Sequence, residues 1–166
     1  MIPFPLVSQK VPKTAYIAGP MTNRPGFNFP AFDAVAERCR TVDGWSVWNP
    51  HEHDQEMYPG IDDAEATQVG DVQKIAEEVG FDLHLAMTWD LQAVSIAEHL
   101  VLLPEWETSS GAKAERFVGE MTGSKIWLAS KCHPSAIDFD DVKGWYLTLD
   151  PKQKRLAPAQ LAEVSA

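Results

Sequence analysis

Residues 99–103 read HLVLL, a short apolar run that the polar loop PEWETSSG follows at residues 104–111. A run of this length that ends in turn residues is typical of a strand buried on both faces of a sheet. After the loop, a helical pattern places four apolar side chains on one face: Ala114, Phe117, Val118 and Met121. This strand, loop and helix predict one unit of an α/β fold.

The same alternation extends outward in both directions. Residues 14–19, TAYIAG, form a β-prone run that stops at Gly19-Pro20. We expect a helix capped by Asn28, helices near residues 71–79 and from Thr88, and further strands at residues 45–48, 125–129 and 144–149. Residues 51–70 show no clear period. Strands that alternate with helices predict a parallel sheet covered on both faces, with ligands beyond the carboxyl ends of its strands.

Size and charge limit the classes of protein. A chain of 166 residues with 45% hydrophobic residues suits one domain, expected at residues 14–150, with an N-terminal extension at 1–13 and a C-terminal tail at 151–166. A net charge of -10 argues against a long nucleic-acid partner. The cysteines, Cys39 and Cys132, form no C-x-x-C pair, and we expect neither a signal peptide nor a membrane span. These features favour a cytoplasmic protein.

Two loops carry residues suited to binding a ligand. The first, GPMTNRPGFN at residues 19–28, has glycines that allow close backbone approach, and Asn23 and Arg24 supply donors, but it matches neither common phosphate-binding motif. An ordinary strand-to-helix turn is the alternative. The second ends in Ser109-Ser110-Gly111 directly before a helix, where free N–H groups and hydroxyls favour an anion. The alternative there is a simple helix cap.

Acidic residues near these loops suggest chemistry on a sugar. Glu115 lies about one turn into its helix, and Asp90 is expected in the first turn of the preceding helix. One carboxylate of such a pair can attack an anomeric carbon while the other protonates the leaving group. The alternative is that both merely favour the helix dipole. His51, His53 and Asp54 lie in a polar loop with no matching third cluster, so we expect no metal site.

Several blocks resemble a known family. The runs YIAGPMTNRPGFNFPAFDAVAERC, WSVWNP and LPEWETSSGAKAE look like the small phage and bacterial proteins of the DUF4406 type, which belong to the nucleoside 2-deoxyribosyltransferase-like superfamily. The resemblance implies a single-domain Rossmann-like (flavodoxin-like), doubly wound parallel sheet of about five strands. It also implies that Glu115 attacks C1′ of the sugar, that Tyr16 holds this carboxylate in position, and that Asp90 helps to protonate the departing base.

One departure from the family pattern concerns the substrate. Deoxyribosyltransferases carry an aspartate where this chain has Ser109, and serine there is similar to the deoxynucleoside 5′-monophosphate N-glycosidases, in which it contacts the phosphate. An aspartate would repel that group. Arg24 and Ser109 would then hold the phosphate. The full set of expected substrate-binding residues is Gly19, Pro20, Met21, Asn23, Arg24, Asn28, Trp89, Trp106, Ser109, Ser110 and Gly111.

The sequence thus predicts an N-glycosidase that hydrolyses a (deoxy)nucleoside 5′-monophosphate through a covalent glycosyl-enzyme intermediate. Base exchange between deoxynucleosides is one alternative, and a nucleotide-binding module without turnover is another. The resemblance implies a homo-oligomer, and aromatic residues near 104–106 and 145–146 are compatible with its interface. No cofactor is expected.

Overall fold

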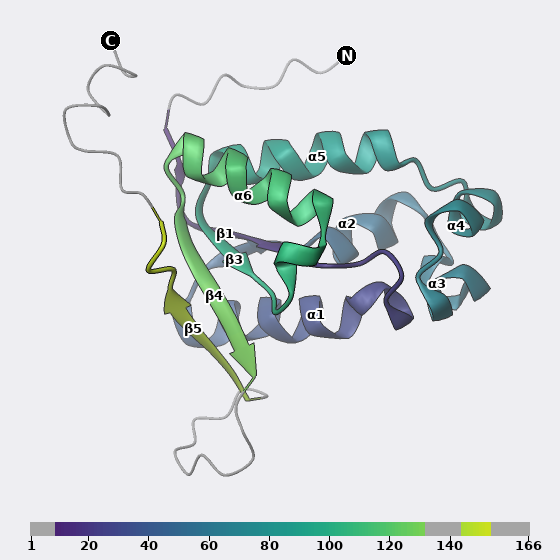
Figure 1. Cartoon of the computed structure of the whole chain (residues 1–166), viewed down its shortest axis with the longest axis horizontal. Coiled ribbons are helices and arrows are strands. Elements are labelled where there is room, and N and C mark those ends of the chain that lie inside the picture. The colour runs from purple at the N-terminus through teal and green to yellow at the C-terminus, as the bar shows by residue number, and fades with distance from the viewer. Residues whose placement is uncertain (1–8, 132–143, 154–166) are drawn as a thin grey trace.

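A computed structural model describes residues 9–131 and 144–153 of the chain. The first eight residues of the predicted N-terminal extension, Cys132 and the predicted tail from residue 154 lie outside this range. The described part contains a five-stranded sheet in the order β2-β1-β3-β4-β5 (Figure 1). Its strands are β1 (Val11–Ala18), β2 (Ser46–Trp48), β3 (Ala97–Leu102), β4 (Lys125–Lys131) and β5 (Trp145–Leu149).

The sheet is parallel except at one edge. β1 pairs in parallel with β2 and β3, and β3 with β4, whereas β5 runs antiparallel to β4. Tyr16 lies in the middle of this arrangement, opposite Trp48 on β2 and Leu100 on β3. The predicted α/β class and Rossmann-like single domain are confirmed, and the expectation of a wholly parallel sheet is corrected at β5. An antiparallel neighbour needs no helical crossover to reach the edge of the sheet.

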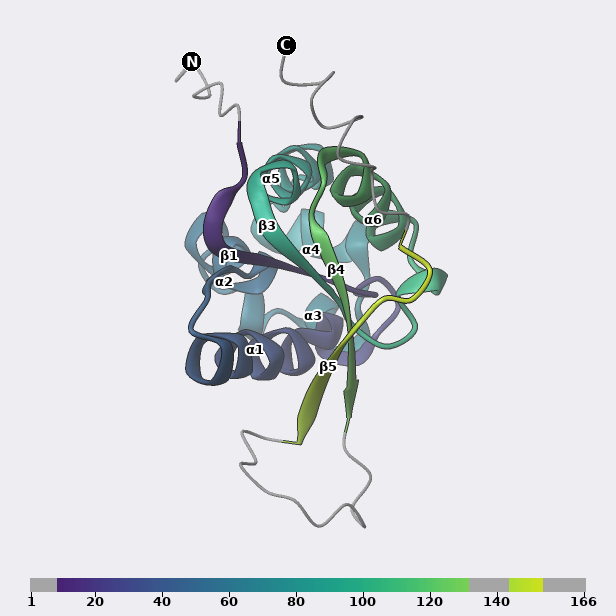
Figure 2. The ribbon, with the colours of Figure 1, turned by 90° about the vertical axis from the view of Figure 1, so that its left-hand side faces the viewer.

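Helices cover both faces of the sheet. Helices α5 (Leu83–Ile96) and α6 (Ser110–Thr122) lie on one face and α1 (Phe29–Arg38) on the other, as the two views in Figures 1 and 2 show. The remaining helices are α2 (Pro50–Met57), α3 (Glu65–Val69) and α4 (Val72–Val79), with short helical turns at η1 (Pro25–Asn28), η2 (Cys39–Asp43), η3 (Ile61–Asp63) and η4 (Trp106–Thr108). In the described residues no helix has the length and apolar character needed to cross a membrane.

Two helical predictions need correction. Residues 51–70, which show no period in the sequence, contain α2, η3 and α3. Helix α5 begins at Leu83 rather than at Thr88, because the Asp82 side chain caps it by accepting a hydrogen bond from the Leu85 N–H at 3.1 Å. Asp90 therefore lies in the middle of α5, two turns from its start, and not in its first turn. The macrodipole explanation for this carboxyl loses its basis.

The apolar face expected for α6 is also wrong. Phe117 and Met121 are 64% and 65% exposed, whereas the buried residues of this helix are Ala112, Glu115 and Gly119. A Cβ atom at Gly119 would come within 2.7 Å of a Leu100 methyl carbon, so the helix lies close to the sheet at this position. Small residues bring α6 down onto β3, and Glu115 is buried with them.

Candidate active site

A cavity of about 580 Å³ opens beyond the carboxyl ends of β1 and β3, where a doubly wound sheet usually binds its ligand. Its volume is that of an ordinary small-molecule pocket. Its walls come from the loop after β1, from α1 and α2, from the first half of α5 with the residue Phe81 before it, and from the start of α6. The lining residues are Gly19, Pro20, Met21, Thr22, Asn23, Phe32, Pro50, Asp54, Phe81, Leu83, Ala86, Met87, Asp90, Thr108, Ser109, Ser110, Gly111, Ala112 and Glu115.

The three residues expected to be catalytic come together at this cavity. Tyr16 is completely buried in β1, and its hydroxyl donates a hydrogen bond of 2.8 Å to Oε1 of Glu115. Glu115 and Asp90 both line the cavity, one from α6 and the other from α5. The charge of Asp90 raises the pKa of Glu115, so the two carboxyls are close enough to interact. Side chains separated by 99 residues of sequence thus meet at one wall.

Burial dominates the electrostatics of this group. Desolvation raises the pKa of Glu115 to about 8, with the charge of Asp90 adding to the rise and the hydrogen bond from Tyr16 opposing it. Desolvation also raises the pKa of Asp90 to about 7. The pKa of Tyr16 rises well above its usual value through burial and the two neighbouring carboxyls, so this hydroxyl keeps its proton. Two carboxyls that interact this closely release their protons as a pair, and near neutral pH one proton is shared between them.

The start of α6, about one turn before Glu115, offers hydrogen-bond donors. Ser109 is the N-cap of α6, and its hydroxyl oxygen accepts from the Ala112 N–H at 3.2 Å. A hydroxyl that accepts in this way still has its own proton to donate. The first N–H groups of a helix lack intrahelical acceptors, which leaves those of Ser110 and Gly111 for a ligand at the cavity wall. The helix-cap reading and the anion-site reading of this loop are therefore compatible.

The loop after β1 is held in place from outside the cavity. The Asn23 N–H donates to the Gly70 carbonyl oxygen at 2.9 Å, and Asn23 has a left-handed φ of 61°. A Cβ at Gly70 would lie only 2.3 Å from the Arg24 carbonyl oxygen, so the backbone at the end of α3 touches this loop directly. Gly19 is similarly restricted, because a Cβ there would come within 2.7 Å of Leu103. Packing within the protein thus accounts for Gly19 without any ligand.

Four of the expected binding residues lie outside the cavity wall. Arg24 forms an ion pair with Glu105 at 2.8 Å, behind the lining residue Thr108. Asn28 begins α1, but its side chain makes no capping hydrogen bond, which corrects the expected cap. The Trp89 ring stacks on His53 at 3.9 Å, and the Trp106 ring lies 5.2 Å from the Arg116 guanidinium. Binding by Arg24, Trp89 or Trp106 would require their present contacts to change.

No sequence pattern identified which side chains of residues 50–87 line the cavity. Asp54, buried in α2, is the most polar of them, and Phe81, Leu83, Ala86 and Met87 form the apolar part. The Asn49-Pro50 pair was the available signal. Asn at the N-cap followed by Pro in the first turn is a common helix start, and the Asn49 side chain accepts from the His51 N–H. Because residues 51–70 show no period, α2 was not expected, and neither was a place for Asp54 in the cavity wall.

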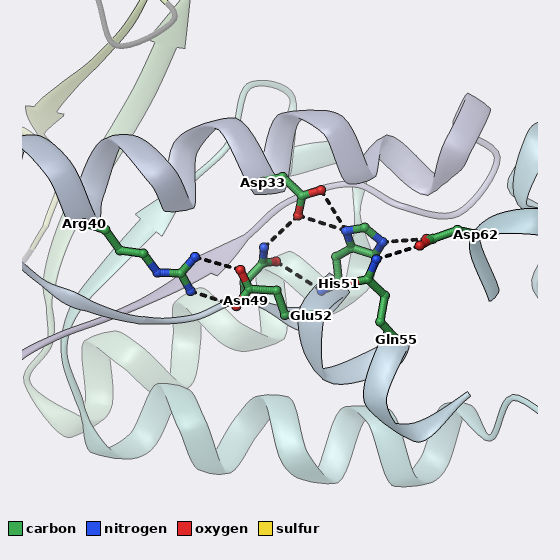
Figure 3. A network of polar contacts seen from close by, with 7 residues as sticks. All are labelled: Asp33, Arg40, Asn49, His51, Glu52, Gln55 and Asp62. Atoms are coloured by element: carbon green, nitrogen blue, oxygen red, sulfur yellow. Dashed lines mark hydrogen bonds and ion pairs between the residues drawn. The ribbon is translucent and has the colours of Figure 1, made fainter. Parts of the chain in front are cut away.

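A second polar cluster lies on the other side of α2 (Figure 3). The ring nitrogens of His51 contact the carboxylates of Asp33 on α1, at 2.8 Å, and of Asp62 on η3, at 2.7 Å. The pKa of His51 is raised because its hydrogen bonds and the charges of both aspartates outweigh burial, which lowers it. Both ring nitrogens are therefore engaged in joining α1, α2 and η3. Within residues 9–131 and 144–153 no group of side chains has the composition of a metal site.

Comparison with known proteins gives one match. The model of a family described as a domain of unknown function, DUF4406, matches residues 13–128. No curated protein and no solved structure matches the chain. The matched segment contains every residue that lines the cavity.

Proposed function

Because this chain belongs to the DUF4406 family, whose function is unknown, we propose from its cavity that it is a nucleotide N-glycosidase. It hydrolyses a (deoxy)nucleoside 5′-monophosphate to a free base and a sugar 5-phosphate. The observation that carries this proposal is that Tyr16 bonds to Glu115, which interacts with Asp90, in a cavity that the start of α6 also lines. The resemblance to the nucleoside 2-deoxyribosyltransferase-like superfamily, based on the same three residues, adds support.

The chemistry divides into two displacements at C1′ of the sugar. In the first, the Glu115 carboxylate forms a bond to C1′ while the C1′–N bond breaks, and Asp90 gives its proton to the departing base. In the second, water attacks C1′ and the bond to Glu115 breaks. Asp90 takes the proton from that water, which restores both carboxyls. The sum is nucleotide plus water giving base plus sugar 5-phosphate.

The protonation state of the carboxyl pair governs these roles. The nucleophile must be ionised and the acid protonated, so the reaction needs the proton on Asp90. Burial raises the pKa of Glu115 to about 8 and that of Asp90 to about 7, so in the free site the proton favours Glu115, and the bound substrate must shift it to Asp90. Tyr16 positions the nucleophile, and its hydrogen bond lowers the pKa of Glu115 toward the value that the reaction needs.

A 5′-phosphate fits the start of α6. Ser109 and Ser110 supply hydroxyls there, and the N–H groups of Ser110 and Gly111 supply backbone donors at the positive end of the helix dipole. No carboxylate of α6 lies in its first turn, so this end of the cavity does not repel an anion. Arg24 adds positive charge from behind Thr108 without lining the cavity.

The proposal is tested by incubating the purified chain with nucleosides and their 5′-monophosphates and following free base by chromatography. We expect release from monophosphates only. Exchange of one base for another would instead support a deoxyribosyltransferase, and binding without any release would support a nucleotide-binding module. Full activity in a Glu115→Ala variant would contradict the covalent mechanism.

Substituting Gly111 tests the phosphate site separately from the chemistry. A Cβ at Gly111 would meet no protein atom closer than 3.7 Å, so Gly111→Ala fits the fold while it narrows the cavity beside the proposed phosphate position. Alanine in a helix also stabilises relative to glycine, by up to about 1 kcal/mol. We expect KM for monophosphates to rise about tenfold, as the loss of one good hydrogen bond would give. Lys113→Ala, which removes an exposed cation from the same helix end, is the matched control and should leave KM nearly unchanged.

A further inference from the structure

Asp54 is a buried carboxyl that the mechanism above does not use. It is only 6% exposed, it lines the cavity, and within the described residues its carboxylate has neither a hydrogen bond nor an ion pair. Its backbone carbonyl accepts from Tyr58, which is an ordinary helix bond. Burial raises the pKa of the Asp54 carboxyl to about 7, and the charge of Asp90 raises it further. Among the described residues only Arg116 Nε is a fully enclosed side-chain polar atom without a partner, so the carboxylate oxygens of Asp54 reach the open space of the cavity.

The surroundings of Asp54 leave the cavity as the place for its partner. His51, one turn earlier on α2, is the nearest cation-forming side chain, but its ring nitrogens are taken by Asp33 and Asp62. Asp90, which faces Asp54 from α5, has the same sign of charge. Within the described residues no side chain donates to this carboxylate, so its donor comes from whatever fills the cavity, which is water in the free site and a ligand when one is bound.

The position of Asp54 indicates which part of a bound nucleotide would carry that donor. Figures 1 and 2 show α2 and α6 on opposite sides of the cavity end of the sheet, with α5 between them. A nucleotide with its phosphate at the start of α6 and its C1′ at Glu115 and Asp90 extends its base toward α2. This step rests on the proposed function.

We propose that Asp54 determines base specificity by accepting a hydrogen bond from an exocyclic amino group of the base. The substrates are then nucleotides whose base carries an amino group on its outer edge, as adenine and cytosine do. Hypoxanthine and uracil have a carbonyl oxygen at the corresponding position. That oxygen would face the carboxylate oxygens without a proton between them, which repels the base.

Matched pairs of substrates give the test. Deoxyadenosine and deoxyinosine monophosphates differ by this one group, as do deoxycytidine and deoxyuridine monophosphates. At pH 8, above the pKa of about 7 of Asp54, we expect kcat/KM to favour the amino member of a cleaved pair about tenfold or more, the usual effect of a hydrogen bond to a charged group. In Asp54→Asn, whose amide can donate as well as accept, the ratio should fall to within about threefold of one.

The controls separate this inference from the proposed reaction. Glu56→Gln makes the same change of charge at an exposed position of α2 and should keep the wild-type ratio. Affinities of the same four nucleotides for Glu115→Gln, measured by calorimetry, report base selection without turnover. If the wild type cleaves none of them, the glycosidase proposal fails while these affinities still decide the role of Asp54. Equal or reversed preference in the wild type, or an unchanged ratio in Asp54→Asn, would overturn the inference.

Discussion

Two acidic regions border helix α2 and differ in how their charges are paired. In the first, the carboxylates of Asp33 and Asp62 both contact His51 (Figure 3). In the second, Asp54, Asp90 and Glu115 line one cavity, where the Tyr16 hydroxyl donates a hydrogen bond to Glu115. Paired charges join elements of the fold, whereas unpaired buried carboxyls raise one another's pKa and are typical of functional sites.

The two regions should both lose stability as pH rises, but for different reasons. A carboxyl with a raised pKa resists ionisation in the folded state, so the fold loses stability as pH rises from the unfolded pKa to the folded one. His51 also has a raised pKa, but its protonated form is the one that its partners stabilise. Its contribution is present below its unfolded pKa and disappears as pH rises through its folded pKa. Removing a carboxyl from the cavity should therefore stabilise the chain, and removing His51 should destabilise it.

The largest expected effect is that of Glu115→Gln. Loss of the nucleophile should reduce kcat by about 10³-fold or more. The same variant should be more stable than the wild type at pH 8, by on the order of 2 kcal/mol, because the folded pKa of about 8 exceeds the ordinary value of 4.5 for a free glutamate. Thermal unfolding of both proteins at pH 5 and pH 8 measures their difference in stability, which should be smaller at pH 5. A variant that is less stable at pH 8 would show that the carboxyl supports the fold.

Tyr16→Phe should have the next largest effect. Without the 2.8 Å hydrogen bond the ionised form of Glu115 loses its donor, so its pKa rises further and the acidic limb of kcat moves to higher pH. We expect kcat at pH 7 to fall about 10- to 100-fold, in the range of a positioned proton-transfer contact. The profile of kcat against pH, compared with that of Glu56→Gln, is the measurement. An unshifted acidic limb with reduced kcat would limit Tyr16 to a packing role.

His51→Gln should have the smallest effect on activity and a clear one on stability. Losing the contacts to two half-exposed aspartates should cost about 1–2 kcal/mol in the free energy of unfolding at pH 6, and less at pH 9. Turnover should stay within about twofold, because His51 does not line the cavity. Urea unfolding at both pH values, with kcat measured alongside, tests this. A fall in kcat of clearly more than twofold would mean that the His51 contacts and the cavity are not independent.

The contrast also explains where sequence patterns succeed and where they fail. Apolar strands such as residues 99–103 are evident because burial and hydrophobicity coincide there. In α2 the buried residues after Pro50 are His51 and Asp54, which are polar, so this helix shows no hydrophobic period. In α6 the buried residues include Glu115, so the hydrophobic period pointed to the wrong face of that helix. Local signals fail most often where a fold accommodates a functional or polar requirement.

The positions of the three expected catalytic residues came from the resemblance and not from any period. Tyr16 looked like one more residue of a buried strand, and Asp90 seemed to be at the start of a helix. Their contact depends on strand order and on the length of α5, which only the assembled fold supplies. Asp54 had no such guide, since neither its motif nor its spacing linked it to the other carboxyls.

Gly70 does not line the cavity, yet it fixes the position of a loop that does. It has a left-handed φ of 73° and lies against the backbone of Arg24, so any side chain there would push the loop after β1 away from α3. That loop carries Met21, Thr22 and Asn23 to the cavity. Inherited changes at position 70 would therefore alter the shape of the entrance while every reacting group stays intact, which makes this remote glycine a point from which evolution can retune the range of accepted molecules.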